Sequence, residues 1–118
     1  MNVATWRTKP ETIADVLAGV IELLSVESRW CRHAAAQDAA GNTVPIDDPA
    51  ACRWCLLGAL AQVTRATGIA WDLYSRAMSW LLKFIPGEWI AEFNDDATHG
   101  ELLHVLGLAH SAARRSGL

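Results

Sequence analysis

The 118-residue sequence contains few cysteines, little positive charge and no long apolar run. Its three cysteines cannot all pair with one another, and residues 1–10 contain no apolar segment typical of a secretory leader. We therefore expect free thiols and a cytoplasmic location. No apolar run approaches the roughly 18 residues that a membrane-spanning helix requires, so no membrane is expected as a partner. The net charge of −3 favours no basic face, which makes nucleic acid an unexpected partner.

The sequence also lacks the common catalytic motifs. It has no G-x-S-x-G, no G-x-G-x-x-G and no phosphate-binding P-loop. His99 and His104 lie five residues apart instead of four, so on a helix they project about 140° from each other and cannot share a metal. The Cys31-Arg32-His33 stretch lacks the glutamate that zinc deaminases use for proton transfer. We expect no enzymatic activity and no cofactor.

Apolar residues are abundant, at 52% of the chain, and six of the residues are tryptophan. A chain of this length can bury about two thirds of its unfolded surface without disulfides or metal. We therefore expect a single domain over residues 1–118, with residues 1–9 as an N-terminal arm. Apolar periodicity predicts a mainly α fold, a compact bundle of four to five helices. The predicted helices cover residues 10–29, 49–66, 70–85, 88–93 and 99–115.

Residues 30–48 interrupt the helical pattern. Gly41-Asn42 is a turn signal, and the residues on either side of it, 31–36 and 43–46, are short enough for strands. This predicts a small β-hairpin or a long loop between the first two helices. Asp48 is a suitable N-cap and Pro49 a suitable first residue for the second helix.

The second predicted helix carries a C-x-x-C motif, Cys52 to Cys55. A thioredoxin-type motif needs its first cysteine at a helix start after a strand, whereas the predicted helix begins at Pro49. The motif is therefore interpreted as two small buried side chains on one helix face. The alternative is a structural zinc site with four tetrahedral ligands: Cys31, His33, Cys52 and Cys55.

The helix predicted over residues 70–85 is apolar over about 200° of its circumference, twice what one buried face needs. It either packs between two layers or binds a partner, which includes a second copy of the chain. Tryptophan and arginine dominate binding hot spots. The candidate partner-binding residues on this helix and its neighbour are Trp54, Arg65, Trp71, Tyr74 and Met78. For Trp54 the alternative interpretation is that its indole covers the hairpin region.

An acidic segment is the other candidate surface. Between Phe84 and Ala113 the sequence has five acidic residues and no lysine or arginine. Asp95 and Asp96 are added to the candidate partner-binding residues, as contacts for a basic partner or a cation. The alternative is that Asn94, Asp95 and Asp96 form a connection whose side chains bond to nearby backbone. After it, Thr98 and Glu101 predict a capping box for the last helix.

Several short motifs occur together along the chain. They are Trp30-Cys31, Gly41-Asn42, Asp47-Asp48-Pro49, the run Arg53-Trp54-Cys55-Leu56-Leu57-Gly58-Ala59-Leu60, and Phe93-Asn94-Asp95. In this combination the sequence resembles a family of small uncharacterised proteins from bacteria and their phages, over residues 10–113. The resemblance implies one compact helical domain and a phage or mobile-element context, and it supplies no catalytic residues. Cys52 and the Asp95-Asp96 doublet are not part of the family pattern.

We therefore expect a small, cytoplasmic, non-enzymatic module that binds another protein. In a phage or mobile-element context, such a module would act as an inhibitor or regulator of a host system. The first alternative is a structural zinc protein that uses Cys31, His33, Cys52 and Cys55. The second is a structural homodimer that packs through the helix at residues 70–85.

Overall fold

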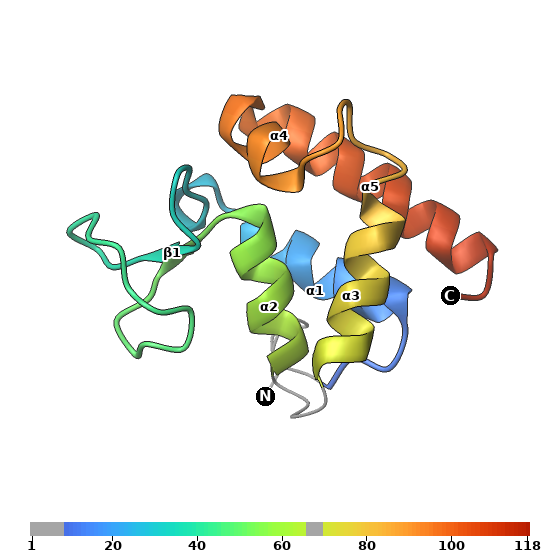
Figure 1. The fold of residues 1–118 in the computed structure, drawn as a ribbon, viewed down its shortest axis with the longest axis horizontal. Helices are drawn as coiled ribbons and strands as arrows, with labels where there is room; N and C mark the ends of the chain where they lie inside the picture. The colour runs from blue at the N-terminus through green and yellow to red at the C-terminus, as the bar shows by residue number, and fades with distance from the viewer. Residues whose placement is uncertain (1–8, 66–69) are drawn as a thin grey trace.

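Helix α1 (Ile13–Leu24) lies in the middle of the helical core in the computed structural model, which describes residues 9–65 and 70–118 (Figure 1). Its apolar residues recur every three or four positions and form one continuous buried side, against which α2, α3 and α5 pack. The Cα radius of gyration is 13.1 Å, close to the value of about 13.5 Å expected for a compact chain of this length. Of the predicted N-terminal arm only Lys9 is described, and Trp6 lies outside the described residues.

The first helix is shorter than predicted. It begins after Thr12, whose Oγ1 accepts a hydrogen bond from the amide of Asp15 at 3.0 Å, while the Asp15 carboxylate accepts one from the Thr12 amide. This capping box, and not Pro10, starts the helix. The helix ends at Leu24, and the residues that follow form a short 3-10 turn, η2 (Glu27–Arg29).

Four more helices confirm the mainly α prediction. They are α2 (Leu56–Arg65), α3 (Ala70–Leu81), α4 (Ile90–Asp96) and α5 (His99–Arg115). The predicted capping box of the last helix is present: Thr98 Oγ1 accepts from the Glu101 amide at 3.1 Å, and Glu101 Oε1 accepts from the Thr98 amide at 2.8 Å.

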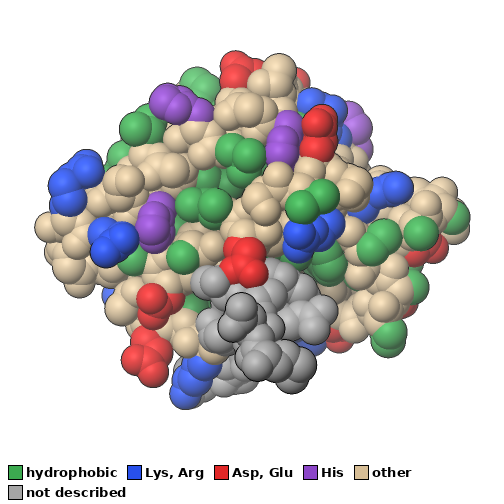
Figure 2. All heavy atoms as spheres, turned by 180° about the vertical axis from the view of Figure 1, so that it is seen from behind, with side chains coloured by type: hydrophobic (Ala, Val, Ile, Leu, Met, Phe, Trp, Pro, Cys, Tyr) green, Lys and Arg blue, Asp and Glu red, His purple; other side chains and the backbone are tan. Residues whose placement is uncertain are grey.

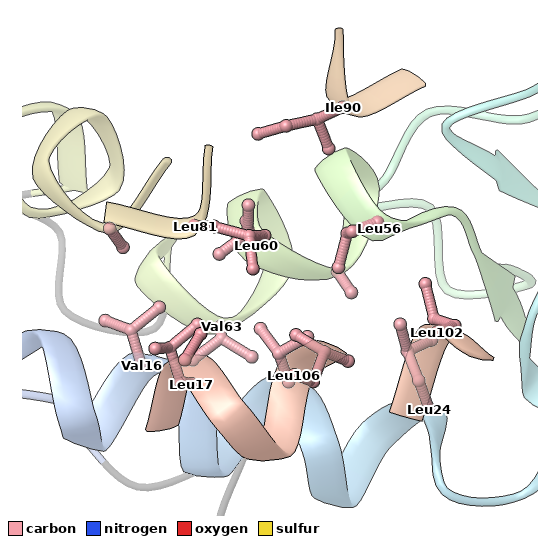
Figure 3. Close-up of a cluster of buried hydrophobic side chains, with 14 of the residues drawn as sticks. Val16, Leu17, Leu24, Leu56, Leu60, Val63, Leu81, Ile90, Leu102 and Leu106 are labelled. Carbon is pink, nitrogen blue, oxygen red and sulfur yellow. The ribbon is translucent and has the colours of Figure 1, made fainter. Parts of the chain in front are cut away.

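The core lies where these helices meet. Side chains from α1, α2 and α5 interdigitate, and Leu81 of α3 and Ile90 of α4 approach the same cluster (Figure 3). Leucine dominates the fully buried positions of this cluster, and each helix contributes one apolar side. Residues that are far apart in sequence therefore share one hydrophobic core.

A small antiparallel sheet lies between α1 and α2, as predicted. Strand β1 (Ala36–Gln37) pairs with β2 (Arg53–Trp54), with Ala36 opposite Trp54 and Gln37 opposite Arg53. The predicted partner segment, residues 43–46, contributes only an isolated bridge between Thr43 and Gln37.

Strand β2 corrects the prediction of a second helix that begins at Pro49. Asp48 does not cap a helix: its Oδ1 accepts from the amide of Ala50 at 2.7 Å in a local turn. The amides of Cys52 and Cys55 donate to carbonyl groups of residues 37 and 35. Because these donors are taken up by a distant segment, the helix starts only at Leu56.

The interpretation of residues 94–96 as a connection after a helix over residues 88–93 is also wrong. Helix α4 does not end at Phe93 but continues through Asn94, Asp95 and Asp96, which form its last turn. Isolated aspartate and asparagine disfavour helix interiors because their side chains compete for backbone bonds. Here the side chains of Asn94 and Asp95 bond to the segment around residues 30–33 instead, so the helix continues through them.

Candidate functional site

An aromatic hollow of about 310 Å³ lies between α2, the start of α3 and the loop before β2. It brings together three of the predicted partner-binding residues, Arg65, Trp71 and Tyr74. No sequence signal identified its other three lining residues, which are Ile46 of the loop and Ala61 and Thr64 of α2.

Trp71 is the most exposed large apolar side chain among the described residues, at 75%. Its ring stacks on that of Tyr74, with 5.7 Å between the ring centroids and 26° between the ring planes. Tyr74 is half-buried, and burial raises the pKa of its hydroxyl, which therefore stays protonated at neutral pH. The pair presents an apolar surface with one hydroxyl group.

Arg65 closes the hollow beside the loop. Its Nη2 lies 3.0 Å from Oδ2 of Asp47, and both side chains are about half exposed. This ion pair connects the last residue of α2 to the loop that carries Ile46. The Arg65 guanidinium has five N–H donors, so binding Asp47 leaves donors for a further acceptor.

The other two aromatic-surface candidates lie elsewhere. Trp54 is 6% exposed because it sits in β2, where its indole N–H donates to the Ile46 carbonyl at 3.5 Å. It therefore supports the wall of the aromatic hollow from inside and offers almost no surface to a partner. Met78 is half-buried against the core and does not line the hollow.

Asp95 takes part in an internal junction. Its Oδ1 accepts from the His33 amide at 2.9 Å, and its Oδ2 lies 3.2 Å from Nδ1 of the His33 ring. His33 has a φ of 66°, a left-handed conformation that is unusual for a residue other than glycine and that this contact holds in place. Desolvation opposes ionisation of Asp95, but the bonds from His33 and Asn94 together lower its pKa below the ordinary 3.8.

Asp96 points to a different surface from its neighbour. It is exposed and lines a second hollow with residues of the α3–α4 connection and the start of α5. The two aspartates therefore do not form one docking site or one cation site.

Three of the four residues of the zinc alternative have side chains engaged in other contacts. The buried Cys31 thiol donates to the Ala34 carbonyl at 3.4 Å, and the ring of His33 faces Asp95. Cys55 acts as a cap for α2, since its Sγ accepts from the amide of Gly58 at 3.3 Å. Within residues 9–65 and 70–118, no three cysteine, histidine or acidic side chains are grouped so that they could hold a metal ion.

The thiols are also poorly suited to nucleophilic chemistry. Burial raises the pKa of Cys31 to about 11 and also raises that of Cys55. Both are therefore protonated at neutral pH, and the thiolate is the reactive form.

Charge is mixed over the face behind that of Figure 1. Basic, acidic and histidine side chains alternate there among the described residues, without a continuous basic region (Figure 2). None of the described helices is long and apolar enough to cross a membrane.

These features define a small α-helical domain with a two-stranded sheet and an exposed aromatic hollow. The chain belongs to a family of unknown function, DUF6197, whose model matches residues 8–114. The resemblance to an uncharacterised family is therefore confirmed. The chain matches no curated protein and no solved structure.

Proposed function

We propose that this protein is a non-enzymatic module that binds a partner protein through the aromatic hollow. The observation that carries the proposal is the Trp71–Tyr74 stack, because 75% of a large indole is left in water beside a hollow. Tryptophan, tyrosine and arginine are the residue types enriched at the energetic centres of interfaces, and here all three border one hollow. Contiguous exposed apolar surface on a small domain is typical of binding sites.

The lining of the hollow suggests what it binds. Ile46, Ala61 and the two rings suit an apolar side chain of the partner. The remaining donors of Arg65 suit a carboxylate next to that side chain. We therefore propose a partner segment with an apolar residue beside an aspartate or glutamate.

We also propose a biological role for the module. A cytoplasmic protein from a phage or mobile element that covers a surface of a host protein would inhibit or regulate that protein. The resemblance described from the sequence supports this role. The absence of a catalytic motif in the sequence and the protonated state of the buried thiols favour binding over catalysis.

The test compares Trp71→Ala with Leu108→Ala, which also truncates an exposed apolar side chain but lies on α5. The wild type and each variant are immobilised and incubated with host lysate, and the protein that they capture is identified and purified. The affinity of this captured protein for the wild type and for each variant is then measured. We expect Leu108→Ala to bind as the wild type does and Trp71→Ala to bind at least tenfold more weakly, with equal melting temperatures. Equal affinity of the two variants would show that the hollow is not the binding surface.

The homodimer alternative makes a different prediction for the same surface. If the partner is a second copy, sedimentation should show a dimer that dissociates on dilution and is absent in Trp71→Glu. A monomeric wild type at all concentrations removes this alternative.

A further inference from the structure

A second hollow, of about 340 Å³, lies on another part of the surface, and we call it the acidic hollow. It is formed by the turn that ends the α3–α4 connection, by α4 and by the first turn of α5. Its lining residues include Glu88, Trp89, Glu92, Phe93, Asp96 and Glu101. None of the residues of the aromatic hollow is among them.

An exposed indole forms one wall of the acidic hollow. Trp89 is 68% exposed, although it occupies the N-cap position of α4, where it makes no side-chain capping bond. Phe93, one turn along the same helix, is 8% exposed and provides an apolar floor. Leaving a large aromatic ring in water beside an apolar floor gains nothing for folding, which points to a ligand for this surface.

Four carboxylates surround these rings. Glu88, Glu92 and Asp96 are exposed and have no ion-pair partner among the described residues. The Thr98 amide and hydroxyl lower the pKa of Glu101, so its carboxylate is negatively charged at neutral pH. The segment between Phe84 and Ala113 contains no lysine or arginine. The guanidinium of Arg32 reaches the edge of the hollow, where it donates to the carbonyl of Ala97 at 2.6 Å.

The spacing of the carboxylates indicates which kind of cation the acidic hollow can bind. In the described part of the chain no three acidic, cysteine or histidine side chains converge closely enough to hold a metal ion, and this includes the carboxylates of the acidic hollow. A long cationic side chain has different requirements: its alkyl stem lies on an aromatic face while its charged end reaches one or two carboxylates. The phosphates of a nucleic acid or an anionic lipid surface would be repelled.

We infer that the acidic hollow binds a segment of a partner protein that carries lysine or arginine. The cationic side chain lies over the indole of Trp89 and its charged end among the carboxylates of Glu88, Glu92 and Asp96. This surface is separate from the aromatic hollow, so the inference does not depend on the function proposed above.

The test is a nuclear magnetic resonance titration of the full chain. The probe is an eight-residue capped peptide of alternating glycine and arginine, and the control peptide has glutamine in place of arginine. The indole N–H signal of Trp89 is identified by its loss in Trp89→Phe. We expect a saturable shift of this signal and of the α4 amides with the arginine peptide only. The binding should weaken several-fold as salt rises from about 0.01 M to 0.1 M, because the Debye length falls from about 30 Å to 10 Å.

Two variants locate the binding. Trp89→Ala should weaken it about two- to fivefold, the range expected for an exposed cation–π contact. The double variant Glu88→Gln/Glu92→Gln should weaken it at least tenfold. Its matched control is Glu11→Gln/Glu27→Gln, which removes the same charge at two exposed positions outside the hollow and should have little effect. All substituted side chains are exposed, so the fold is retained, as amide spectra will show.

Three results would overturn the inference. The first is the absence of a shift of the Trp89 signal, or an equal shift with the glutamine peptide. The second is an equal loss of affinity in the two double variants, which would mean that only net charge matters. The third is displacement of the peptide by calcium chloride at matched ionic strength, which would indicate a metal site.

Discussion

The indole N–H of Trp30 donates to Oδ1 of Asn94 at 2.7 Å and joins segments that are 64 residues apart. The same oxygen accepts from the amide of Leu56 at 2.9 Å, and Asn94 Nδ2 donates to the carbonyl of Cys31 at 3.1 Å. One fully buried amide thus connects the segment after α1, the first turn of α2 and α4. Three of the motifs on which the family resemblance rests, those that contain Trp30, Leu56 and Asn94, meet at this amide, and their role here is structural.

Replacing Asn94 with alanine should strongly destabilise the protein. The change leaves two buried donors without acceptors, and each such group costs about 1–3 kcal/mol. We expect urea denaturation to show a loss of about 3–5 kcal/mol. Asn42→Ala is the control, since its exposed amide bonds only to Asp38 at 3.3 Å, and it should cost less than about 1 kcal/mol. Similar losses in both variants would contradict the structural role of Asn94.

Gly58 should not tolerate a side chain. A Cβ at this position would lie 1.9 Å from the carbonyl oxygen of Ala35, and that backbone is fixed by its bond from the Cys55 amide. Gly58→Ala should therefore lower the free energy of unfolding by about 1–3 kcal/mol or more.

Gly107→Ala is the matched helical control, because nothing lies within 4 Å of its Cβ position. It should stabilise α5 by about 0.5–1 kcal/mol. If Gly58→Ala is as stable as the wild type, the carbonyl of Ala35 does not lie as close to α2 as the structure shows.

The three thiols should differ in reactivity. At pH 8 a thiol with a pKa of about 11 is ionised in about one molecule per thousand, so Cys31 should react slowly with iodoacetamide, and buried Cys55 should do the same. Cys52 is half-buried in the loop before β2 and should be alkylated first. Mass spectrometry of the digested protein measures the order, and in urea the three rates should converge. Equal rates in the folded protein would contradict the burial of Cys31 and Cys55.

Stability should depend on the ionisation of Asp95. Its pKa is lowered on folding, so the charged form contributes stability above the ordinary value of 3.8, and this contribution is lost as the pH falls through the lower folded value. Asp95→Asn should cost about 1 kcal/mol at pH 7, because the pair with His33 is partly exposed to solvent.

Asp95→Asn should lose less stability than the wild type as the pH falls from about 5 to about 2, and urea denaturation at each pH measures this loss. The exposed neighbour provides a control, Asp96→Asn, which should keep the steeper pH dependence of the wild type. An identical pH profile for wild type and Asp95→Asn would show that this carboxylate is not stabilised by folding.

Part of the candidate site followed from sequence. The wide apolar arc of α3 and the hot-spot residue types identified Arg65, Trp71 and Tyr74, which border one hollow. The helix predicted over residues 49–66 groups Trp54 with them, whereas the structure places it in a strand, with its side chain inside the protein. Trp89 is not among the residues predicted to bind a partner, although an aromatic residue among acidic residues, with no basic residue nearby in the sequence, is a signal for such a site.

The sequence by itself determined the elements whose signals are local. Helical apolar periodicity identifies α1, α3 and α5, and the Thr98–Glu101 capping box fixes the start of α5, because these interactions lie within a few residues of one another. Only the tertiary structure decided that β2 is a strand and that Asn94 continues a helix. In both cases the hydrogen-bond partners lie at least 15 residues away, so no local pattern can reveal them.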